Sequence, residues 1–369
     1  MLGGHFAAES GGAQFQALCL TEAVAGQRDF ETFYLANVVP PQLHQNGYEI
    51  VPYGPQRKTG KLGVLPQLPS LYRTLRRVKP KLIYQRCLMP YTGACALFKR
   101  RHGAKMVFHV AHDDDVRRPH FKGWGPRMLM RRLIRRVSEY GLLRADFIIA
   151  QTDHQAQLMQ QEYGLHAAAV LPNFHPMPGE VRTRSAAQGL RVIWVANIKP
   201  AKNPELFVAL AEAFANRSDV HFTMIGNAGD AKRYVDLHQR IARLKNLDYL
   251  GELPVERVNQ EIVASDVFVC TSFSEGFPNV FIQAWLRGVA VVSVDVDPDK
   301  CLSQGGAGIV AGSDENLFKV IADLAADPAR VDQLGARAQA YAQSHHGPER
   351  ARDVVEFLRR CAASRPGKA

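Results

Sequence analysis

The sequence lacks long apolar runs, paired cysteines and internal repeats. None of its apolar stretches approaches the roughly 18 to 20 residues that a membrane-spanning helix needs, and its start, MLGGHFAAES, has no basic-then-apolar signal pattern. No C-x-x-C pair is formed by the six cysteines, which are Cys19, Cys87, Cys95, Cys270, Cys301 and Cys361. Because most of them lie in apolar runs, we expect buried thiols in a reducing compartment. These absences predict a cytoplasmic protein, for which contact with the inner face of the membrane stays open.

Acidic residues are scarce in the N-terminal half. Residues 1–180 hold 23 Lys and Arg but only 13 Asp and Glu, so they carry almost all of the net charge of +11. This asymmetry indicates an acidic partner, such as anionic lipid, a phosphorylated acceptor or nucleic acid, or else a basic surface without a partner. Nucleic acid is not expected, because no element combines basic residues with aromatic residues on which bases stack.

Short apolar runs alternate with amphipathic segments along the chain. The segments between the runs include FQALCLTEAVA, PELFVALAEAFA and DAKRYVDLHQRIARL (residues 230–244), which have helical patterns. This alternation predicts an α/β architecture of doubly wound parallel sheets with helices on both faces. We expect strands at 33–37, 82–85, 106–111, 146–151, 168–173, 191–196, 221–226, 247–251, 266–270, 289–294 and 307–311.

A length of 369 residues suits two such domains rather than one. Residues 175–189 (HPMPGEVRTRSAAQG) are polar, contain proline and break the alternation, so they mark the expected boundary. We therefore predict a first domain over 1–175 and a second over 176–346. Ligands in such sheets bind outside the carboxyl ends of the strands, which predicts a site in a cleft where the two domains meet.

The segment TSFSEGFPNVFIQAWLRG, residues 271–288, carries the strongest functional signal. It places Glu275 in a polar loop after an apolar run, and a Gly-Phe-Pro turn then opens a predicted helix at Asn279. The free N–H groups and the dipole of such a helix end favour phosphate. Glu275 would lie beside this anion site, able to accept hydrogen bonds from sugar hydroxyls. An ordinary strand-turn-helix corner with a solvated Glu275 is the alternative interpretation.

The loop SEGFPNVFIQAWLRGVAVV resembles the donor-binding signature of family 4 glycosyltransferases, in which a Glu, seven residues and a second Glu frame a nucleotide sugar. The segments GGAQFQALCLTEAVA, ADFIIAQTDHQAQLM and VANIKPAKNPELF resemble that family's glycine-rich loop and first helix, its late N-domain strand and helix, and its phosphate-binding basic segment. The resemblance implies a GT-B fold, in which two facing Rossmann-like domains bind the acceptor and the nucleotide-sugar donor, respectively. It also implies that a last helix, within 347–369, returns to the N-terminal domain.

The resemblance assigns roles to individual residues of the donor site. Glu275 matches the first acidic position, which binds hydroxyls of the donor sugar, while Gln283 stands where a second Glu usually bonds the ribose. Lys202 matches the lysine at the diphosphate, whereas Asn197 stands where an arginine is usual, and Lys199 could substitute for it. A cation stabilises the charge that develops on the leaving group, so these departures bear on the rate or the donor identity. The implied donor-binding residues are Gly12, Asn197, Lys199, Lys202, Glu275, Gly276, Phe277, Pro278, Asn279, Val280 and Gln283.

Gly11 and Gly12 open the first predicted helix and would let the backbone approach phosphate closely. The first strand of a Rossmann-like sheet is central, yet only Met1 and Leu2 precede GGHF. We therefore expect the natural chain to start a few residues upstream, and a very short first strand is the alternative.

His112 joins Glu275 and Lys202 in the predicted catalytic set. The run FHVAHDDD, residues 108–115, ends an expected strand, and in the family a histidine or acid near this point contacts the acceptor or the donor sugar. His109 is the alternate. The three acids of the run also contain the Asp-x-Asp pattern that binds a divalent ion in the other large glycosyltransferase fold. Because a phosphate-binding helix end removes the need for a metal, and an acidic run at a strand end is usually solvated, we expect no metal site.

Two segments of the first domain are strongly basic. They are LYRTLRRVKPK, residues 71–81, and residues 117–144, which read as an amphipathic helix from about Pro126. One interpretation is contact of 71–81 and 117–136 with an anionic membrane that carries a lipid-linked acceptor. The other is packing of an apolar stripe on the sheet, formed by Met128, Leu129, Leu133 and Val137.

These features predict a glycosyltransferase that moves a sugar from a nucleotide diphosphate donor to a glycan or lipid-linked acceptor, in the synthesis of cell-surface polysaccharide or glycolipid. The resemblance implies retention of anomeric configuration, with no metal or other cofactor and no obvious protein nucleophile. Two alternatives stay open: a nucleotide-sugar epimerase on the same fold, which would need no acceptor, and a non-catalytic nucleotide-sugar binder or partner subunit.

Overall fold

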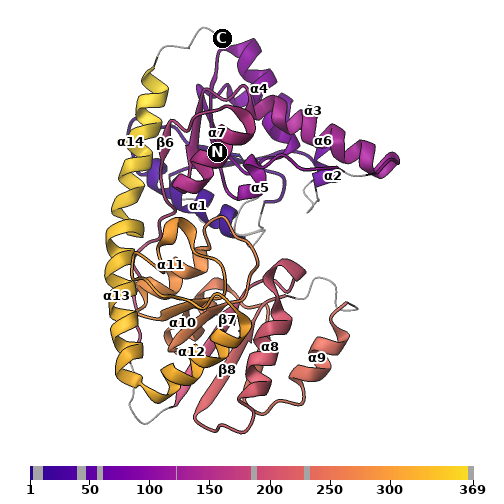
Figure 1. Cartoon of the computed structure of the whole chain (residues 1–369). Helices are drawn as coiled ribbons and strands as arrows, with labels where there is room; N and C mark the ends of the chain where they lie inside the picture. Colours follow the sequence, from indigo (N-terminus) through magenta and orange to yellow (C-terminus); the bar gives the residue numbers. More distant parts are fainter. Residues whose placement is uncertain are drawn as a thin grey trace. The chain divides into compact units, whose positions relative to one another are not determined.

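The computed structural model of the protein describes residues 1–2, 11–39, 47–55, 61–121, 123–183, 189–227 and 233–364. The chain divides into two compact units (Figure 1). The first is Met1–Phe174 together with Pro348–Ala369, and the second is His175–Gly347. Within the described ranges, no helix is both long enough and apolar enough to cross a membrane.

The sheet of the first unit is parallel. Its strands are β1 (Phe33–Ala36), β2 (Glu49–Pro52), β3 (Leu82–Arg86), β4 (Lys105–His109), β5 (Phe147–Ala150) and β6 (Ala169–Val170). β1 pairs with β2, β3 to β6 follow one another in order, and Leu2 bridges Leu35 of β1 and Gln85 of β3. Leu2 thus holds the central place that a Rossmann-like strand order gives to the first strand. Where the natural chain begins stays a prediction.

Helices cover both faces of this sheet because successive side chains of a strand point to opposite sides. Ile83 and Met106 pack with side chains of α3 and α4, whereas their neighbours Tyr84 and Val107 pack with side chains of α1 and α14. The predicted return of the last helix is confirmed, since α14 contacts α1 and β4 (Figure 1). The helices of the unit are α1 (Gly12–Ala25), α2 (Lys61–Val64), α3 (Leu68–Val78), α4 (Pro90–His102), α5 (Asp113–Val116), α6 (Pro126–Leu142), α7 (Asp153–Tyr163) and α14 (Glu349–Ala363).

The basic helix α6 is fixed to α4 by a very close crossing. A Cβ atom added to Gly93 of α4 would lie 2.4 Å from the carbonyl oxygen of Val137, and one added to Gly141 of α6 would lie 2.3 Å from the backbone of Thr92. Such separations are below any normal contact distance, so the crossing requires glycine at both positions.

The buried face of α6 differs from the expected apolar stripe. The helix buries Ile134, Ser138, Gly141 and Leu142, while Leu129 and Leu133 are 68% and 49% exposed. The interpretation in which these two leucines pack on the sheet is therefore wrong. The reason is that the close crossing at Gly141 sets the rotation of the helix, and apolar periodicity alone does not report that rotation.

The described strands of the second unit form one parallel sheet in the order β12, β11, β10, β7, β8, β9. Its strands are β7 (Leu190–Val195), β8 (Val220–Ile225), β9 (Leu247–Gly251), β10 (Val267–Cys270), β11 (Ala290–Ser293) and β12 (Ile309–Val310). From β7 the chain winds outward through β8 and β9, and it then returns to the other side of β7 at β10. The helices are α8 (Pro204–Ala213), α9 (Val235–Ile241), α10 (Val255–Val263), α11 (Asn279–Leu286), α12 (Asp314–Ala326) and α13 (Pro328–His346).

The doubly wound α/β prediction is confirmed. Each expected strand is present, with ends that differ by three residues or fewer. The sequence reasoning missed β2, because the run EIVP is short and ends in proline, which is disfavoured inside a sheet. The helical pattern expected over 230–244 partly falls on residues 228–232, which lie outside the described residues, and α9 covers its later part.

Candidate functional site

The candidate site of the second unit lies at the carboxyl ends of β7 and β10. These two strands are neighbours in the sheet, yet their following segments lead away in opposite directions, because β8 lies beyond β7 and β11 lies beyond β10. Loops separate at such a switch point and leave room for a ligand. The sequence-predicted residues 197–202 follow β7, and residues 275–280 follow β10, so the strand order brings both sets together.

Hydrogen bonds join the loops after β7 and β10. The hydroxyl of Thr271 donates to the carbonyl oxygen of Lys202 at 2.7 Å and accepts from the indole nitrogen of Trp194 at 2.9 Å. The amide of Phe273 donates to the carbonyl oxygen of Ala201 at 3.0 Å. Because the indole of Trp194 is buried in the core, it anchors both loops to the sheet.

Lys202 and Glu275, two of the predicted catalytic residues, form an ion pair between these loops. Lys202 ends the short 3₁₀ turn η2 (Pro200–Lys202), and Glu275 lies in the loop before α11. Both side chains are largely shielded from solvent. An ammonium group has three donors and a carboxylate about four acceptor positions. The pair can therefore stay bonded while Lys202 donates to an anion and Glu275 accepts from hydroxyl groups.

Helix α11 begins directly after this pair, at Asn279. Its N-cap is Pro278, whose side chain makes no capping hydrogen bond. The first N–H groups of a helix have no carbonyl partner one turn earlier, and the helix dipole adds positive character to them. The N–H groups of Asn279 and Val280 are consequently suited to an anion. The preceding Gly276, Phe277 and Pro278 are buried, which fixes the turn that places Glu275.

Two histidines hold the turn and the start of α11. The ring nitrogen Nε2 of His175 lies 3.1 Å from Oδ1 of Asn279, and the His175 amide donates to the carbonyl oxygen of His346 at 2.9 Å. The His346 ring packs on Phe277 at 4.7 Å between centroids and stacks on Trp285 at 5.8 Å. His346 thus contacts the middle residue of the Gly-Phe-Pro turn, and His175 contacts the first residue of the helix that follows it.

His175 is neutral at physiological pH. Burial, reinforced by the nearby His346 and Arg287, lowers its pKa to about 3, against the opposing effect of the bond to Asn279. Because Oδ1 of Asn279 can only accept, Nε2 of the neutral ring carries the proton and donates. Sequence reasoning missed His175, since it lies in the polar segment interpreted as a boundary and belongs to no periodic pattern.

The positions that depart from the family pattern also lie around this site. Asn197 and Lys199 are exposed in the loop after β7, the same loop that carries Lys202. The side-chain amide of Gln283, on α11, donates to Oδ1 of Asn259 on α10 at 3.3 Å. A glutamate at position 283 could not donate to Oδ1 of Asn259, but it could accept from Nδ2 of the same side chain.

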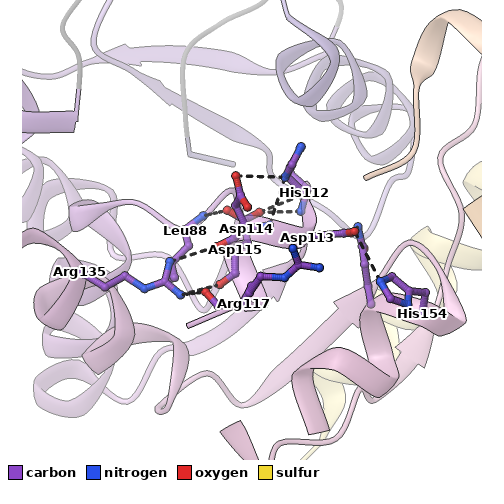
Figure 2. Close-up of polar contacts among 10 residues, drawn as sticks. Leu88, His112, Asp113, Asp114, Asp115, Arg117, Arg135 and His154 are labelled. Carbon is purple, nitrogen blue, oxygen red and sulfur yellow. Dashed lines mark hydrogen bonds and ion pairs between the residues drawn. The ribbon is translucent and has the colours of Figure 1, made fainter. Parts of the chain in front are cut away.

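The candidates Gly12 and His112 belong to the first unit. Gly12 is the exposed first residue of α1. His112 is the N-cap of α5, where its Nδ1 accepts from the amide of Asp114 at 3.1 Å, and its side chain is 40% exposed (Figure 2). Nε2, the other ring nitrogen, is placed where it could bond a ligand. The bond that Nδ1 accepts caps α5 and therefore stabilises the local fold.

Two of the three acids that follow His112 support the loop rather than face solvent. The carboxylate of Asp115 accepts from the amides of Leu88 at 2.8 Å, Ala111 at 2.9 Å and His112 at 3.1 Å (Figure 2). Asp113 accepts from the side-chain amide of Gln155 at 3.0 Å. The expectation that the run is solvated is therefore wrong for these two acids and holds for Asp114. The reason is that buried amides after a strand need acceptors.

No group of three or more His, Cys, Asp and Glu side chains is placed to hold a metal ion in the part of the chain that the structure describes. The engaged carboxylates of Asp113 and Asp115 account for the Asp-x-Asp pattern without a metal. Independence of the reaction from metal stays a prediction.

His109, the alternate to His112, is a buried core residue. Its Nδ1 lies 2.7 Å from the Tyr84 hydroxyl and 3.5 Å from Nη1 of Arg86, whose Nη2 donates to Oδ1 of Asn173 at 2.9 Å. Burial, followed by the charge of Arg86, holds the pKa of His109 well below its usual value. The sequence reasoning also missed Arg86, a buried cation at the carboxyl end of β3, because its position in an apolar run gives no signal of its own.

Comparison with protein families gives two matches along the chain. Residues 8–173 match a family model described as a glycosyl transferase 4-like domain. Residues 189–327 match one described as glycosyl transferases group 1. The matches fall in the first and the second unit, and together they cover most of the chain.

A similar curated protein is D-inositol 3-phosphate glycosyltransferase of Kineococcus radiotolerans. It is 27% identical over 256 residues, which are 60% of this chain and 58% of the relative. The matches to the first curated relatives span only 52 to 58% of the length of those proteins.

Solved structures with the same fold match nearly the whole chain. Sucrose-phosphate synthase from Thermosynechococcus elongatus has a TM-score of 0.78 at 17% identity, covering 96% of this chain and 94% of the other. HepE from Anabaena, in complex with UDP-glucose, has a TM-score of 0.73 at 20% identity, covering 97% of each chain. The shared architecture shows that the chain has the GT-B fold, and the two family matches show that it belongs to the family 4 glycosyltransferases.

Proposed function

We propose that this chain is a glycosyltransferase that moves a sugar from a nucleoside diphosphate to an acceptor. The observation that carries the proposal is the Lys202–Glu275 pair at the switch point between β7 and β10, immediately before the start of α11. A cation, a carboxylate and the N–H groups at the start of a helix are the chemistry that a sugar diphosphate requires. The presence of UDP-glucose in HepE, which has the same fold, supports this class of donor.

The proposed roles follow from the chemistry of each group. Glu275 accepts hydrogen bonds from the hydroxyls of the donor sugar. Lys202 and the N–H groups of Asn279 and Val280 bind the diphosphate, which gains negative charge as the glycosidic bond breaks. Gln283 bonds the ribose. His112 contacts the acceptor or the transferred sugar. Retention of anomeric configuration and independence from metal are part of the proposal.

Calorimetry tests the donor site directly. A panel of nucleoside diphosphates and their sugars is titrated into the wild-type protein and into Lys202→Ala and Glu275→Gln. Lys202→Ala should weaken diphosphate binding about tenfold or more, because a charge-assisted bond to phosphate is lost. Lys245→Ala, which removes an exposed lysine of the same unit, is the matched control. Failure of every nucleotide to bind the wild-type protein would contradict the proposal.

Turnover separates transfer from the alternatives. A glycosyltransferase should consume the bound donor only when an acceptor is added, whereas an epimerase would convert it alone. Binding without consumption over an acceptor panel would indicate a non-catalytic subunit. Asn197→Arg and Gln283→Glu restore the family pattern and should strengthen donor binding if those two departures weaken it.

We propose further that the acceptor is lipid-linked and that the basic surface of α3 and α6 meets an anionic membrane. α3 exposes Arg73, Arg76 and Arg77 while it buries Leu71 and Leu75. α6 adds exposed arginines together with the exposed Leu129 and Leu133. Arginine beside exposed leucine favours the membrane interface. Flotation with anionic and neutral liposomes is the test, and no binding to either would contradict this part of the proposal.

A further inference from the structure

A groove with an estimated volume of about 720 Å³ lies between the segment 118–121 and helix α6 in the first unit. Four arginines line it, whereas Glu139 is the one acid among its lining residues in the described chain. The arginines are Arg118, Arg132, Arg135 and Arg136.

Arg135 and Glu139 neutralise each other. Nε of Arg135 donates to Glu139 at 2.8 Å, and the carboxylate also accepts from the hydroxyl of Tyr163 at 2.7 Å. The remaining donors of Arg135 bond the backbone carbonyls of Asp114 at 3.1 Å and Arg117 at 2.8 Å (Figure 2). Arg135 therefore builds the wall of the groove. Near the other three arginines, Glu162 accepts from the backbone amide of Arg118 at 3.3 Å and not from its guanidinium group.

Two of those three arginines are held in place by their surroundings. Nη2 of Arg132 donates to the carbonyls of Phe121 at 3.1 Å and Gly123 at 3.3 Å. The guanidinium of Arg118 lies over the Tyr163 ring, 4.8 Å from its centroid. Among the described residues, no carboxylate forms an ion pair with Arg118, Arg132 or Arg136. The fixed positions of Arg118 and Arg132 lower the entropic cost of binding an anion.

The chemistry of the groove favours a phosphate ester. Guanidinium groups bind phosphate oxygens through paired N–H donors, with charge assistance. A phosphomonoester carries about 1.5 to 2 negative charges near neutral pH, whereas a phosphodiester carries one. Three arginines whose guanidinium groups form no ion pair among the described residues match the phosphomonoester better.

The surroundings of the groove indicate a lipid as the source of that phosphate. Trp124 is 95% exposed, and the guanidinium of Arg132 lies 5.4 Å from its ring centroid. Leu129 and Leu133 are three positions before Arg132 and Arg136, respectively, so on a helix each leucine adjoins an arginine of the groove. Binding of a water-soluble phosphate ester would not require these apolar side chains to be exposed. Tryptophan and leucine beside arginine, in contrast, suit a membrane interface.

We infer that this groove binds the phosphomonoester head group of an anionic lipid, while Trp124, Leu129 and Leu133 enter the interface of the bilayer. The inference deepens the proposed membrane contact and rests on it, but it is independent of sugar transfer. In this inference, the groove recognises one lipid head group at a defined place in the fold, in addition to the general electrostatic attraction between the basic helices and an anionic membrane.

The test compares two arginine substitutions on the same helix. Arg136→Gln removes a groove arginine, and Arg131→Gln removes an exposed arginine of α6 that does not line the groove. Co-sedimentation uses phosphatidylcholine vesicles that contain phosphatidic acid, and vesicles with phosphatidylserine matched in surface charge. Arg136→Gln should weaken binding to phosphatidic acid about tenfold, and Arg131→Gln should weaken it less than threefold. The wild-type protein should favour phosphatidic acid over phosphatidylserine.

Each other outcome overturns the inference. Equal losses for the two variants would mean that only the total charge matters. Equal binding to the two lipids would remove the preference for a monoester. If glycerol 3-phosphate in solution bound as tightly as the vesicles, the ligand would be a soluble phosphate ester. No binding to any vesicle would overturn the membrane contact as well. Donor calorimetry on the same preparations reports separately on the proposed transferase function, and unchanged melting temperatures confirm that the variants fold.

Discussion

His175→Phe tests whether a histidine outside the recognised motif positions the donor site. The substitution keeps a planar ring and the backbone bond to His346, but it removes the donor that bonds Asn279 at 3.1 Å. Loss of one such hydrogen bond costs about 0.5 to 1.5 kcal/mol. If that bond orders the first N–H groups of α11, the affinity for a nucleoside diphosphate should fall about 2- to 10-fold.

Calorimetry with a double-mutant cycle isolates this single contact. Asn279→Ala should produce a loss similar to that of His175→Phe, and the double variant should be no worse than either single variant. His175→Gln retains an N–H donor and should recover most of the affinity. The matched control is His221→Phe, which removes a histidine bonded to Asp248 at 2.9 Å near the amino end of β8, away from the carboxyl ends of the strands.

Acid stability gives an independent measurement of the same side chain. The unfolded chain protonates His175 below about pH 6.5, whereas the folded chain does so only near its lowered pKa of about 3. Acid therefore favours the unfolded state, and between pH 6.5 and about pH 3 His175 should contribute a loss of about 1.4 kcal/mol in the free energy of unfolding for each pH unit. His175→Phe should remove this contribution to the acid dependence of the free energy of unfolding. Unchanged acid dependence together with unchanged donor affinity would refute the positioning role.

Three further predictions concern the fold and the chemistry. Gly141→Ala should lower the free energy of unfolding, measured in urea, by about 1 to 3 kcal/mol, because its Cβ would lie 2.3 Å from the backbone of Thr92. The control Gly179→Ala, whose Cβ would meet no atom within 4 Å, should have little effect. Equal effects of the two substitutions would contradict the close-crossing argument. Asp115→Asn should cost about 1.5 to 3 kcal/mol in the same assay, because a charged acceptor of buried amides is lost, whereas the exposed Asp114→Asn should be near neutral. Removal of divalent ions with a chelator should leave turnover unchanged, and a loss restored by added metal would show that the reaction needs one.

The parts of the site that were predictable are local in the sequence. Glu275, the Gly-Phe-Pro turn and Asn279 are consecutive, so spacing alone indicated a strand, a turn and a helix start. The acidic run after β4 shows the opposite case. Its sequence is that of a solvated loop, but Asp115 is buried because the amide of Leu88, 27 residues earlier, needs an acceptor. Burial depends on the partner, and the partner is distant along the chain.

Sequence by itself determined the order of strands and helices apart from β2, because apolar periodicity reports which residues must leave water. It also determined which loops carry Lys202 and Glu275. Only the tertiary structure decided which of those loops meet. Lys202 and Glu275 are 73 residues apart, and His175 and Asn279 are 104 apart. Each pair meets in the folded second unit, where the sheet sets β7 beside β10. Likewise, the close glycine crossing turned Leu129 and Leu133 of α6 toward solvent. These outcomes depend on packing between segments far apart in the chain, which no local pattern of residues records.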